Sequence, residues 1–359
     1  MVLLNVLLFM LGVAIVAGTL LSAIQTFVLP RSARDPLTSL VFRVMRVPFD
    51  LITNRLRTYR GRDRVMALYV PISLLTLPVV WLTNVALGYM LMYLTLGVQS
   101  WQAAFTLSGS SLLTLGFAPV TDLTTTLLAF SEAIIGLILV ALLIAYLPTM
   151  YSAFSRRETA VTLLEVRAGS PPSAAEMILR FHRMKHLSQL NDIWVAWEVW
   201  FVEVEETHTS LAALSFFRSP QPNRSWITAA GAVLDTAALV SSTIDQPRQT
   251  EAELCIRAGF LALRHIATFF RIPYDPNPKP NDPISVTHQE FEEVYDQLVG
   301  AGVPVKPDRE QAWRDFAGWR VNYDTVLLAL AALTMAPEAP WSSDRSLRTQ
   351  RSKRKLRRR

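Results

Sequence analysis

Residues 101–122 read WQAAFTLSGSSLLTLGFAPVTD and decide the fold of this chain, because they separate two long apolar segments. Residues 101–113 are apolar but too few to cross a hydrocarbon core of about 30 Å, which takes about 20 helical residues. The letters TLGFAP at 114–119 then interrupt the helical pattern. A short helix, a turn with glycine and a second long helix are the layout of a re-entrant loop, whose backbone needs protein or water around it.

Three apolar segments predict membrane-spanning helices, at residues 1–29, 66–96 and 123–154. They account for much of the 51% hydrophobic content of the 359 residues and for the mean hydropathy of +0.28. The first segment has no Lys or Arg before Arg31 and is longer than the apolar region of a typical signal peptide. We therefore expect an uncleaved helix at 1–30, with a cleaved signal peptide as the alternative.

The distribution of arginine predicts the orientation in the cell membrane. Residues 31–64 contain nine Arg and three Asp, whereas residues 97–121 contain no Lys or Arg, and Arg156 and Arg157 follow the third apolar segment. Basic loops stay on the cytoplasmic side. We expect the N-terminus and the 97–122 loop outside, and the C-terminal part of the chain in the cytoplasm.

Residues 66–157 resemble the pore unit of potassium channels, with an outer helix, a pore helix, a filter strand and an inner helix. The sequence SLLTLGF at 111–117 is similar to the Thr-x-x-Thr-Val-Gly-Tyr pattern of that family. The resemblance implies a filter of backbone carbonyls that replace the hydration shell of a permeant monovalent cation, potassium in that family. It also implies that the Thr114 hydroxyl is a ligand and that the filter residues are Thr114, Leu115, Gly116, Phe117 and Ala118.

The resemblance extends to the third span and to the number of subunits. Gly136 matches a glycine at which the inner helix of that family bends, and Gly116 suits the backbone angles of a filter. One chain supplies one filter strand, so a pore needs several copies, and four is the number in the family. Glu132 lies within the third span, where an acid usually faces a bundle interior or a wet cavity.

The chain departs from the family after Phe117. Ala118-Pro119 stands where the family has Gly-Asp, and Asp122 comes three residues later. An alanine at a left-handed position is strained by about 1 kcal/mol, so we expect an adjusted filter mouth. A polar external turn at 108–119 is the alternative. Against it stand the six hydroxyl residues or glycines at 106–114, which have no charged neighbour in that stretch.

The basic loop at 31–65 predicts a helix that lies in the membrane interface. Apolar residues over 37–56 alternate with arginines at helical spacing, and Pro48 is expected to kink the helix. A basic linker is the alternative. The side chains expected at anionic lipid headgroups are Arg43, Arg46, Arg55 and Arg57, together with Lys353, Arg354 and Lys355 of the C-terminal tail.

Residues 158–347 predict an all-α cytoplasmic domain. Helical patterns cover 174–188, 191–217, 225–242, 249–270, 287–300 and 309–335, and the Pro-rich stretch 272–284 is expected to be a loop. The large side chains expected in its core are Trp194, Trp197, Trp200, Phe201, Trp313 and Trp319. Its sequence shows no phosphate loop or catalytic triad, so we expect no enzyme activity, no cofactor and no metal site.

The tail at 348–359 contains eight basic residues and no acid. This composition is typical of disorder and of lipid binding, and nucleic acid is not expected because no aromatic residues are interleaved. The sequence thus predicts an all-α membrane protein with three transmembrane helices, a re-entrant pore helix and a filter. Its expected function is a passive cation channel, with a non-conducting membrane receptor or scaffold as the alternative.

Overall fold

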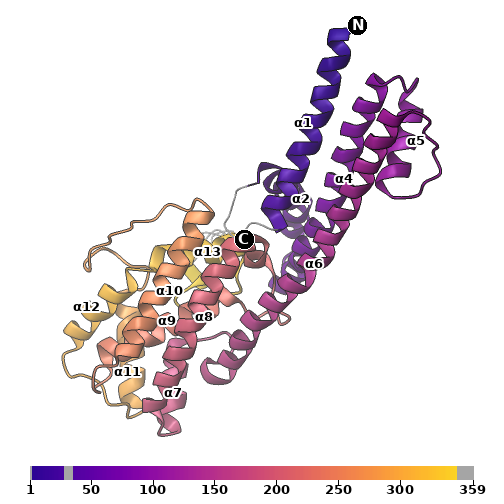
Figure 1. Cartoon of the computed structure of the whole chain (residues 1–359). Helices are drawn as coiled ribbons and strands as arrows, with labels where there is room; N and C mark the ends of the chain where they lie inside the picture. The colour runs from indigo at the N-terminus through magenta and orange to yellow at the C-terminus, as the bar shows by residue number, and fades with distance from the viewer. Residues whose placement is uncertain (1, 28–34, 346–359) are drawn as a thin grey trace. The chain divides into compact units, whose positions relative to one another are not determined.

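The computed structural model describes residues 2–27 and 35–345 (Figure 1). The tail residues Lys353, Arg354 and Lys355, with the rest of 346–359, lie outside the described residues. The chain divides into two compact units, Met1–Ser152 and Ala153–Arg359, and the boundary falls within the long helix α6. Helices dominate both units. Within the described ranges the only β pairing is an isolated bridge between Ile244 and Val305.

The first unit contains three helices that are long and apolar enough to cross a membrane, which confirms the three predicted spans. The second of them begins earlier than expected, because residues from Tyr59 onward are already helical. The helices of this unit are α1 (Val2–Phe27), α2 (Pro36–Arg55), α3 (Tyr59–Ala67), α4 (Tyr69–Thr95), α5 (Trp101–Leu112) and the first part of α6 (Leu123–Ala168).

Helices α1 and α4 pack closely through two glycines. A β-carbon at Gly12 would lie 2.5 Å from the carbonyl oxygen of Gly88, and one at Gly88 would lie 2.8 Å from that of Gly12. Small residues allow helix backbones in lipid to approach so closely, and dispersion then holds them together. This contact places the N-terminal half of α1 against the C-terminal half of α4.

A short chain of polar side chains connects α1, α2 and α4. The Trp81 indole donates to the Ser22 hydroxyl at 3.0 Å, and Ser22 donates to the carboxylate of Asp35 at 2.5 Å. Asp35 also accepts from the backbone N–H groups of Leu37 and Thr38, so it caps the N-terminus of α2. Such caps typically stabilise a helix by about 1 kcal/mol.

The second unit is a helical domain, seen as the orange, rose and yellow helices of Figure 1. Its α-helices after α6 are α7 (Ala174–Arg183), α8 (Leu190–Ser210), α9 (Trp226–Thr243), α10 (Thr250–Phe269), α11 (His288–Gly300), α12 (Arg309–Arg320) and α13 (Asp324–Thr334). Short 3₁₀ turns occur at Leu187–Gln189, Ala212–Phe216 and Ser343–Arg345. Helix α11 begins with a reciprocal capping box between Thr287 and Glu290.

Three predicted helices were wrong in extent. The helix expected at 174–188 ends at Arg183, because Lys185 adopts a left-handed φ of 60° and closes the turn. The helix expected at 191–217 ends at Ser210. The helix expected at 309–335 is two helices, because Asn322 and Tyr323 make tight turn bonds to Trp319 and Arg320. At this break Arg264 donates to the carbonyl oxygen of Asn322 at 2.9 Å.

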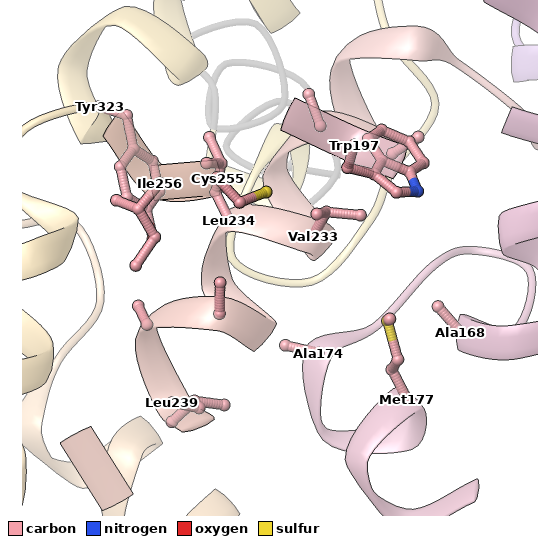
Figure 2. Packing of buried hydrophobic residues seen from close by; sticks show 14 of the residues in the cluster. Ala168, Ala174, Met177, Trp197, Val233, Leu234, Leu239, Cys255, Ile256 and Tyr323 are labelled. Atoms are coloured by element: carbon pink, nitrogen blue, oxygen red, sulfur yellow. The ribbon is translucent and has the colours of Figure 1, made fainter. Parts of the chain in front are cut away.

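The core of the second unit surrounds α9, which is buried along nearly its whole length (Figure 2). Ala, Val and Leu side chains of α9 meet Trp197 of α8 and Cys255 of α10. The prediction of a tryptophan-rich core is confirmed for Trp194, Trp197, Trp200 and Phe201. It was wrong for Trp313 and Trp319, which pack on the core but remain partly exposed.

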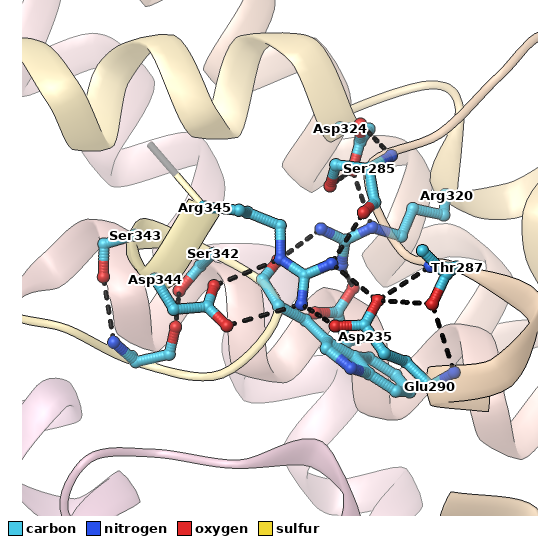
Figure 3. A network of polar contacts seen from close by, with 12 residues as sticks. Asp235, Ser285, Thr287, Glu290, Arg320, Asp324, Ser342, Ser343, Asp344 and Arg345 are labelled. Carbon is cyan, nitrogen blue, oxygen red and sulfur yellow. Dashed lines mark hydrogen bonds and ion pairs between the residues drawn. The ribbon is translucent and has the colours of Figure 1, made fainter. Parts of the chain in front are cut away.

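One buried arginine organises the polar interior of this core (Figure 3). The fully buried Arg320 guanidinium contacts the carboxylate of Asp235, the main-chain oxygen of Trp341 and, at 2.8 Å, the carboxylate of Asp324. Tyr323 donates to Asp235 at 2.9 Å. Burial by itself lowers the pKa of Arg320, but the two carboxylates more than offset this and raise it. The guanidinium is therefore charged and bonded to groups from three segments.

A second buried polar cluster lies where α6 enters this unit. The buried Arg157 donates to Glu158 at 2.7 Å, to the carbonyl oxygen of Leu214 at 2.7 Å and to that of Phe217 at 3.0 Å. Its guanidinium also lies 3.2 Å from Nε2 of the fully buried His208. Burial, and then the charge of Arg157, lower the pKa of His208 well below its ordinary 6.5.

The helical unit should lose stability in mild acid because of His208. The unfolded chain takes up a proton below pH 6.5 that the folded chain excludes, so stability is full above this pH and falls as the pH decreases. We expect a loss of about 1.4 kcal/mol between pH 7.5 and pH 5.5. Hydrogen exchange of α8 and α9 amides in the full-length protein measures it. The variant His208→Phe should lack this part of the slope, and an equal slope in both proteins would contradict the assignment.

Candidate functional site

The site predicted from sequence is the segment between α4 and α6. Helix α5 begins at Trp101 because the Ser100 hydroxyl accepts from the backbone N–H of Ala103 at 3.1 Å. It runs for 12 residues, about 18 Å at 1.5 Å per residue, too short to cross a bilayer. The short apolar helix expected at 101–113 is therefore present between the second and third candidate spans.

Helix α5 ends in a left-handed cap built on Thr114. The backbone N–H of Leu115 donates to the carbonyl oxygen of Ser110 at 2.8 Å, and that of Thr114 donates to Ser111 at 3.0 Å. These two bonds form a Schellman motif, in which the left-handed residue is usually glycine. Thr114 holds it with a φ of 55°, which is strained for a β-branched side chain.

The strained non-glycine residue of this segment is Thr114, four residues before Ala118, where the sequence predicted the strain. Gly116 has a φ of 71°, as expected of a filter glycine, and a β-carbon there would meet nothing within 4 Å. Ala118 does not adopt a left-handed φ. The expectation of a strained alanine was wrong, because Thr114 and Gly116 together reverse the chain before it reaches Ala118.

Ser110 accepts hydrogen bonds from the backbone N–H groups of residues 115–118. Its carbonyl oxygen accepts from Leu115 and, at 3.3 Å, from Gly116. Its hydroxyl oxygen accepts from Phe117 at 3.0 Å and from Ala118 at 3.1 Å. Four successive N–H groups thus face one serine. Within residues 2–27 and 35–345, no hydrogen-bond donor contacts the carbonyl oxygens of residues 114–118.

The side chains of this segment are exposed on the single chain. Leu115 and Phe117 are each 60% exposed, and Leu113 is similarly open. The Thr114 hydroxyl donates to the carbonyl oxygen of Leu113 at 2.7 Å, so its oxygen keeps lone pairs for another partner. Apolar side chains on a turn that is itself bounded by two spans need lipid or another protein surface around them.

Glu132 of α6 connects the short helix to both long helices. Its fully buried carboxylate accepts from the Ser108 hydroxyl of α5 at 2.5 Å and from the Tyr93 hydroxyl of α4 at 2.8 Å. Tyr89 adds a contact of 2.7 Å to Ser131. Glu132 therefore faces a packed protein interior, one of the two environments expected from its position.

Gly136 lies one turn further along α6, where the end of α5 meets that helix. A β-carbon at Gly136 would overlap the carbonyl oxygen of Leu112. The glycine is thus required for the close approach of α5. The predicted bending of the inner helix at Gly136 stays a prediction, and α6 is one continuous helix through this residue.

The arginines predicted to face lipid lie on and just after α2. Arg46 pairs with Asp50 at 3.1 Å and lies over the Tyr69 ring, and Arg43 donates to its own helix. Arg55 is in the last turn, and Arg57 follows the helix. The apolar face of α2 is exposed at Leu40, Val44, Val47, Leu51 and Ile52, as an interfacial helix requires.

Sequence reasoning missed Ser110, Ser108 and Tyr93. Ser108 and Ser110 belong to the hydroxyl-rich stretch that was noted only for its lack of charge. The helical period was the available signal for Ser108, since it places that residue on the same face of α5 as the buried Ala104. No sequence signal pointed to Tyr93, because its role depends on which helix lies beside α4.

Comparisons of this chain with protein-family models, with characterised proteins and with solved structures find no match. The site therefore has to be judged on its own geometry. It consists of a short helix between two candidate spans, held by a buried carboxylate, and of a strained turn with four inward N–H groups.

Proposed function

We propose that this protein is a passive cation channel of the cell membrane, built from several copies of the chain around one axis. The residues at the axis are Thr114, Leu115, Gly116, Phe117 and Ala118, whose carbonyl oxygens replace the water around a permeant monovalent cation. The resemblance to potassium-channel pore units implies that the ion is potassium and that four copies of the chain form the pore.

The single observation that carries this proposal is that the backbone N–H groups of the segment 114–118 are hydrogen-bonded within the described residues, whereas its carbonyl oxygens are not. The N–H groups of residues 115–118 are all used by Ser110 of the same chain. The carbonyl oxygens of residues 114–118 meet no donor in the described part of the chain. Backbone oxygens at membrane depth are costly to leave unpaired, and ions or water satisfy them at low cost.

The exposed side chains of the same segment support assembly. Leu115 and Phe117 expose 60% of their surfaces on a single chain. In a ring of copies they would pack against the short helices of neighbouring copies, while the carbonyls face the axis. Burial of a side chain of this size typically contributes about 1.5–3 kcal/mol, so the same contact would stabilise the ring.

The proposed orientation follows the arginines. The N-terminus and the loop after α4 lie outside, and the helical domain of residues 158–347 lies in the cytoplasm. Helix α2 lies along the inner leaflet with its exposed apolar face in the lipid and its arginines near anionic headgroups.

The test is ion flux from potassium-loaded liposomes that contain the purified protein. The variant Gly116→Ala should lower the flux at least about tenfold, because alanine at a φ of 71° costs about 1–2 kcal/mol in every copy of the chain. Gly97→Ala is a matched control. Gly97 has a φ of 102° and open space around it, but it lies before α5, in the α4–α5 connection, so the flux should persist.

Two results would reject the channel. One is folded wild-type protein that passes no monovalent cation. The other is an equal loss of flux in Gly116→Ala and Gly97→Ala, which would show that backbone strain anywhere between α4 and α6, and not a filter, is responsible. Measuring the mass of the detergent-solubilised protein decides whether several copies assemble at all.

The second candidate is a non-conducting membrane receptor or scaffold with a pore-like fold. The observation that favours it is the left-handed cap at Thr114, which curls the chain at the first filter position. In that case the protein forms a stable oligomer without flux, and the cytoplasmic unit carries the function. The same liposome measurement, combined with the mass of the oligomer, separates the two candidates.

A further inference from the structure

A cavity of about 530 Å³ lies in the helical unit, apart from the membrane-spanning segments. Its walls come from the end of α9, the loop that precedes α10, residue Lys306 and one side of α12. Pockets for small ligands usually measure about 300–1,000 Å³. The volume of this cavity therefore suits a small molecule of up to about thirty non-hydrogen atoms.

Two cations line this cavity without a carboxylate partner. Lys306 donates one N–H of its ammonium group to the carbonyl oxygen of Ser241 at 2.9 Å, which leaves two of its three donors. Its main chain is held by bonds to Thr243 and Tyr295, so the base of the side chain is fixed. Arg314 is exposed on α12, and no ion pair joins it to any residue in the described ranges.

Two buried polar atoms in the same cavity wall have no hydrogen-bond partner within the described part of the chain. They are the hydroxyl oxygen of Ser241 and the side-chain amide nitrogen of Gln246. A buried polar group without a hydrogen-bond partner destabilises the folded protein by about 1–3 kcal/mol. Such groups are rare in folded proteins, and a bound ligand, ion or water often accounts for them. Both groups can donate a hydrogen bond, and an acceptor-rich ligand would satisfy them once their side chains turn toward the cavity.

The two carboxylates at the cavity are already engaged. Glu253 accepts two bonds of 2.6 Å from Arg248, and Asp315 accepts from the Gln311 amide at 2.7 Å. The Gln311 amide is neutral, so Asp315 keeps its negative charge, and the lining carries three cations, Arg248, Lys306 and Arg314, against two carboxylates. This inventory favours an anion over a cation.

Apolar side chains also belong to the cavity lining. They include Val240, Pro280 and the partly buried Trp319. Pro280 of the Pro-rich loop lies close to Gly318 of α12, so this loop closes one side of the cavity. An indole face stacks well on planar rings.

We propose that this cavity binds a small phosphate monoester that carries a planar ring, of the size of a nucleoside monophosphate. Lys306 and Arg314 hold the phosphate, the Ser241 hydroxyl and the Gln246 amide turn toward the cavity to donate to its oxygens, and Trp319 stacks on the ring. This site lies in the second unit and is independent of ion conduction.

Calorimetric titration of the full-length protein in detergent tests the proposal with four probes: adenosine monophosphate, ribose 5-phosphate, inorganic phosphate and adenosine. We expect adenosine monophosphate to bind at least tenfold more tightly than the other three. The variant Trp319→Ala should bring it to the level of ribose 5-phosphate.

Two further variants keep the test independent of folding. Lys306→Met and Arg314→Ala should each weaken adenosine monophosphate at least tenfold, as expected for loss of a charged hydrogen bond. Arg314 is exposed on its helix, so its replacement is compatible with folding. Arg257→Ala is the control, because Arg257 is an exposed arginine of α10 outside the cavity lining, and it should bind as the wild type does.

Three outcomes would overturn the proposal. They are no binding of any probe, equal binding of inorganic phosphate and adenosine monophosphate, and equal weakening by Arg314→Ala and Arg257→Ala. The second outcome would leave a general anion site without ring recognition, and the third would leave only non-specific charge attraction.

Discussion

Replacing Arg320 with methionine is expected to destabilise the helical unit by about 3–5 kcal/mol. The change leaves the buried carboxylates of Asp235 and Asp324 facing each other without a cation, and it removes a donor from the carbonyl oxygen of Trp341. Hydrogen exchange in the full-length protein should show the loss in α9, α12 and α13, the three helices that this network joins.

The controls separate the buried charge from a general effect of removing arginine. Arg183→Met removes an arginine whose side chain is 64% exposed and pairs with Glu176 at the surface, so exchange should change little. The double variant Asp235→Asn with Arg320→Met should recover part of the stability, because one uncompensated charge is gone. Wild-type exchange in Arg320→Met would mean that the network does not hold these helices together.

Gly136→Ala is expected to displace the short helix α5 and to abolish ion flux. The new methyl group overlaps the carbonyl oxygen of Leu112, which belongs to a backbone held by the cap at Thr114 and cannot rotate away. Overpacking of this kind typically costs about 1–3 kcal/mol even where side chains can yield. The thermal stability of the solubilised protein and the flux from liposomes should fall together.

Gly109→Ala is the matched control for this variant. Gly109 lies in α5, has an ordinary φ and has open space where the β-carbon would stand. Alanine there should stabilise the helix by about 1 kcal/mol, since glycine is a poor helix former. If Gly136→Ala keeps both stability and flux, α5 does not depend on the close contact with α6, and bending at Gly136 becomes the better explanation for this glycine.

The sequence predicted that a helix exists wherever a long apolar segment or a clear helical pattern was present. It did not predict where the helices end. The spans at 1–29, 66–96 and 123–154 and the short helix after Ser100 follow from hydropathy and from a capping serine. The break inside 309–335 does not, because at this break the carbonyl oxygen of Asn322 accepts from Arg264, a residue of another helix. Tertiary hydrogen bonds of this kind outweigh local propensity, which differs by less than about 1 kcal/mol per residue.

The candidate site shows the same limit. Gly116 was predicted to need a positive φ and has one, since only glycine takes that conformation at low cost. Thr114 was predicted as a ligand and is in addition the strained cap of α5. Ser110 was missed, because nothing in the sequence distinguishes it from the neighbouring serines. Only the folded turn shows that four backbone N–H groups donate to it.

The amino-acid sequence alone predicted three helices that are long and apolar enough to cross a membrane, a short apolar helix between the last two and a helical unit after them. Length and apolar character suffice for that, because water and lipid act on each segment separately. Only the tertiary structure decided that Glu132 binds Ser108 and Tyr93, that Gly136 admits Leu112, and which groups line the cavity near Lys306. These contacts join residues far apart in the chain, and their energies exist only once the helices have packed.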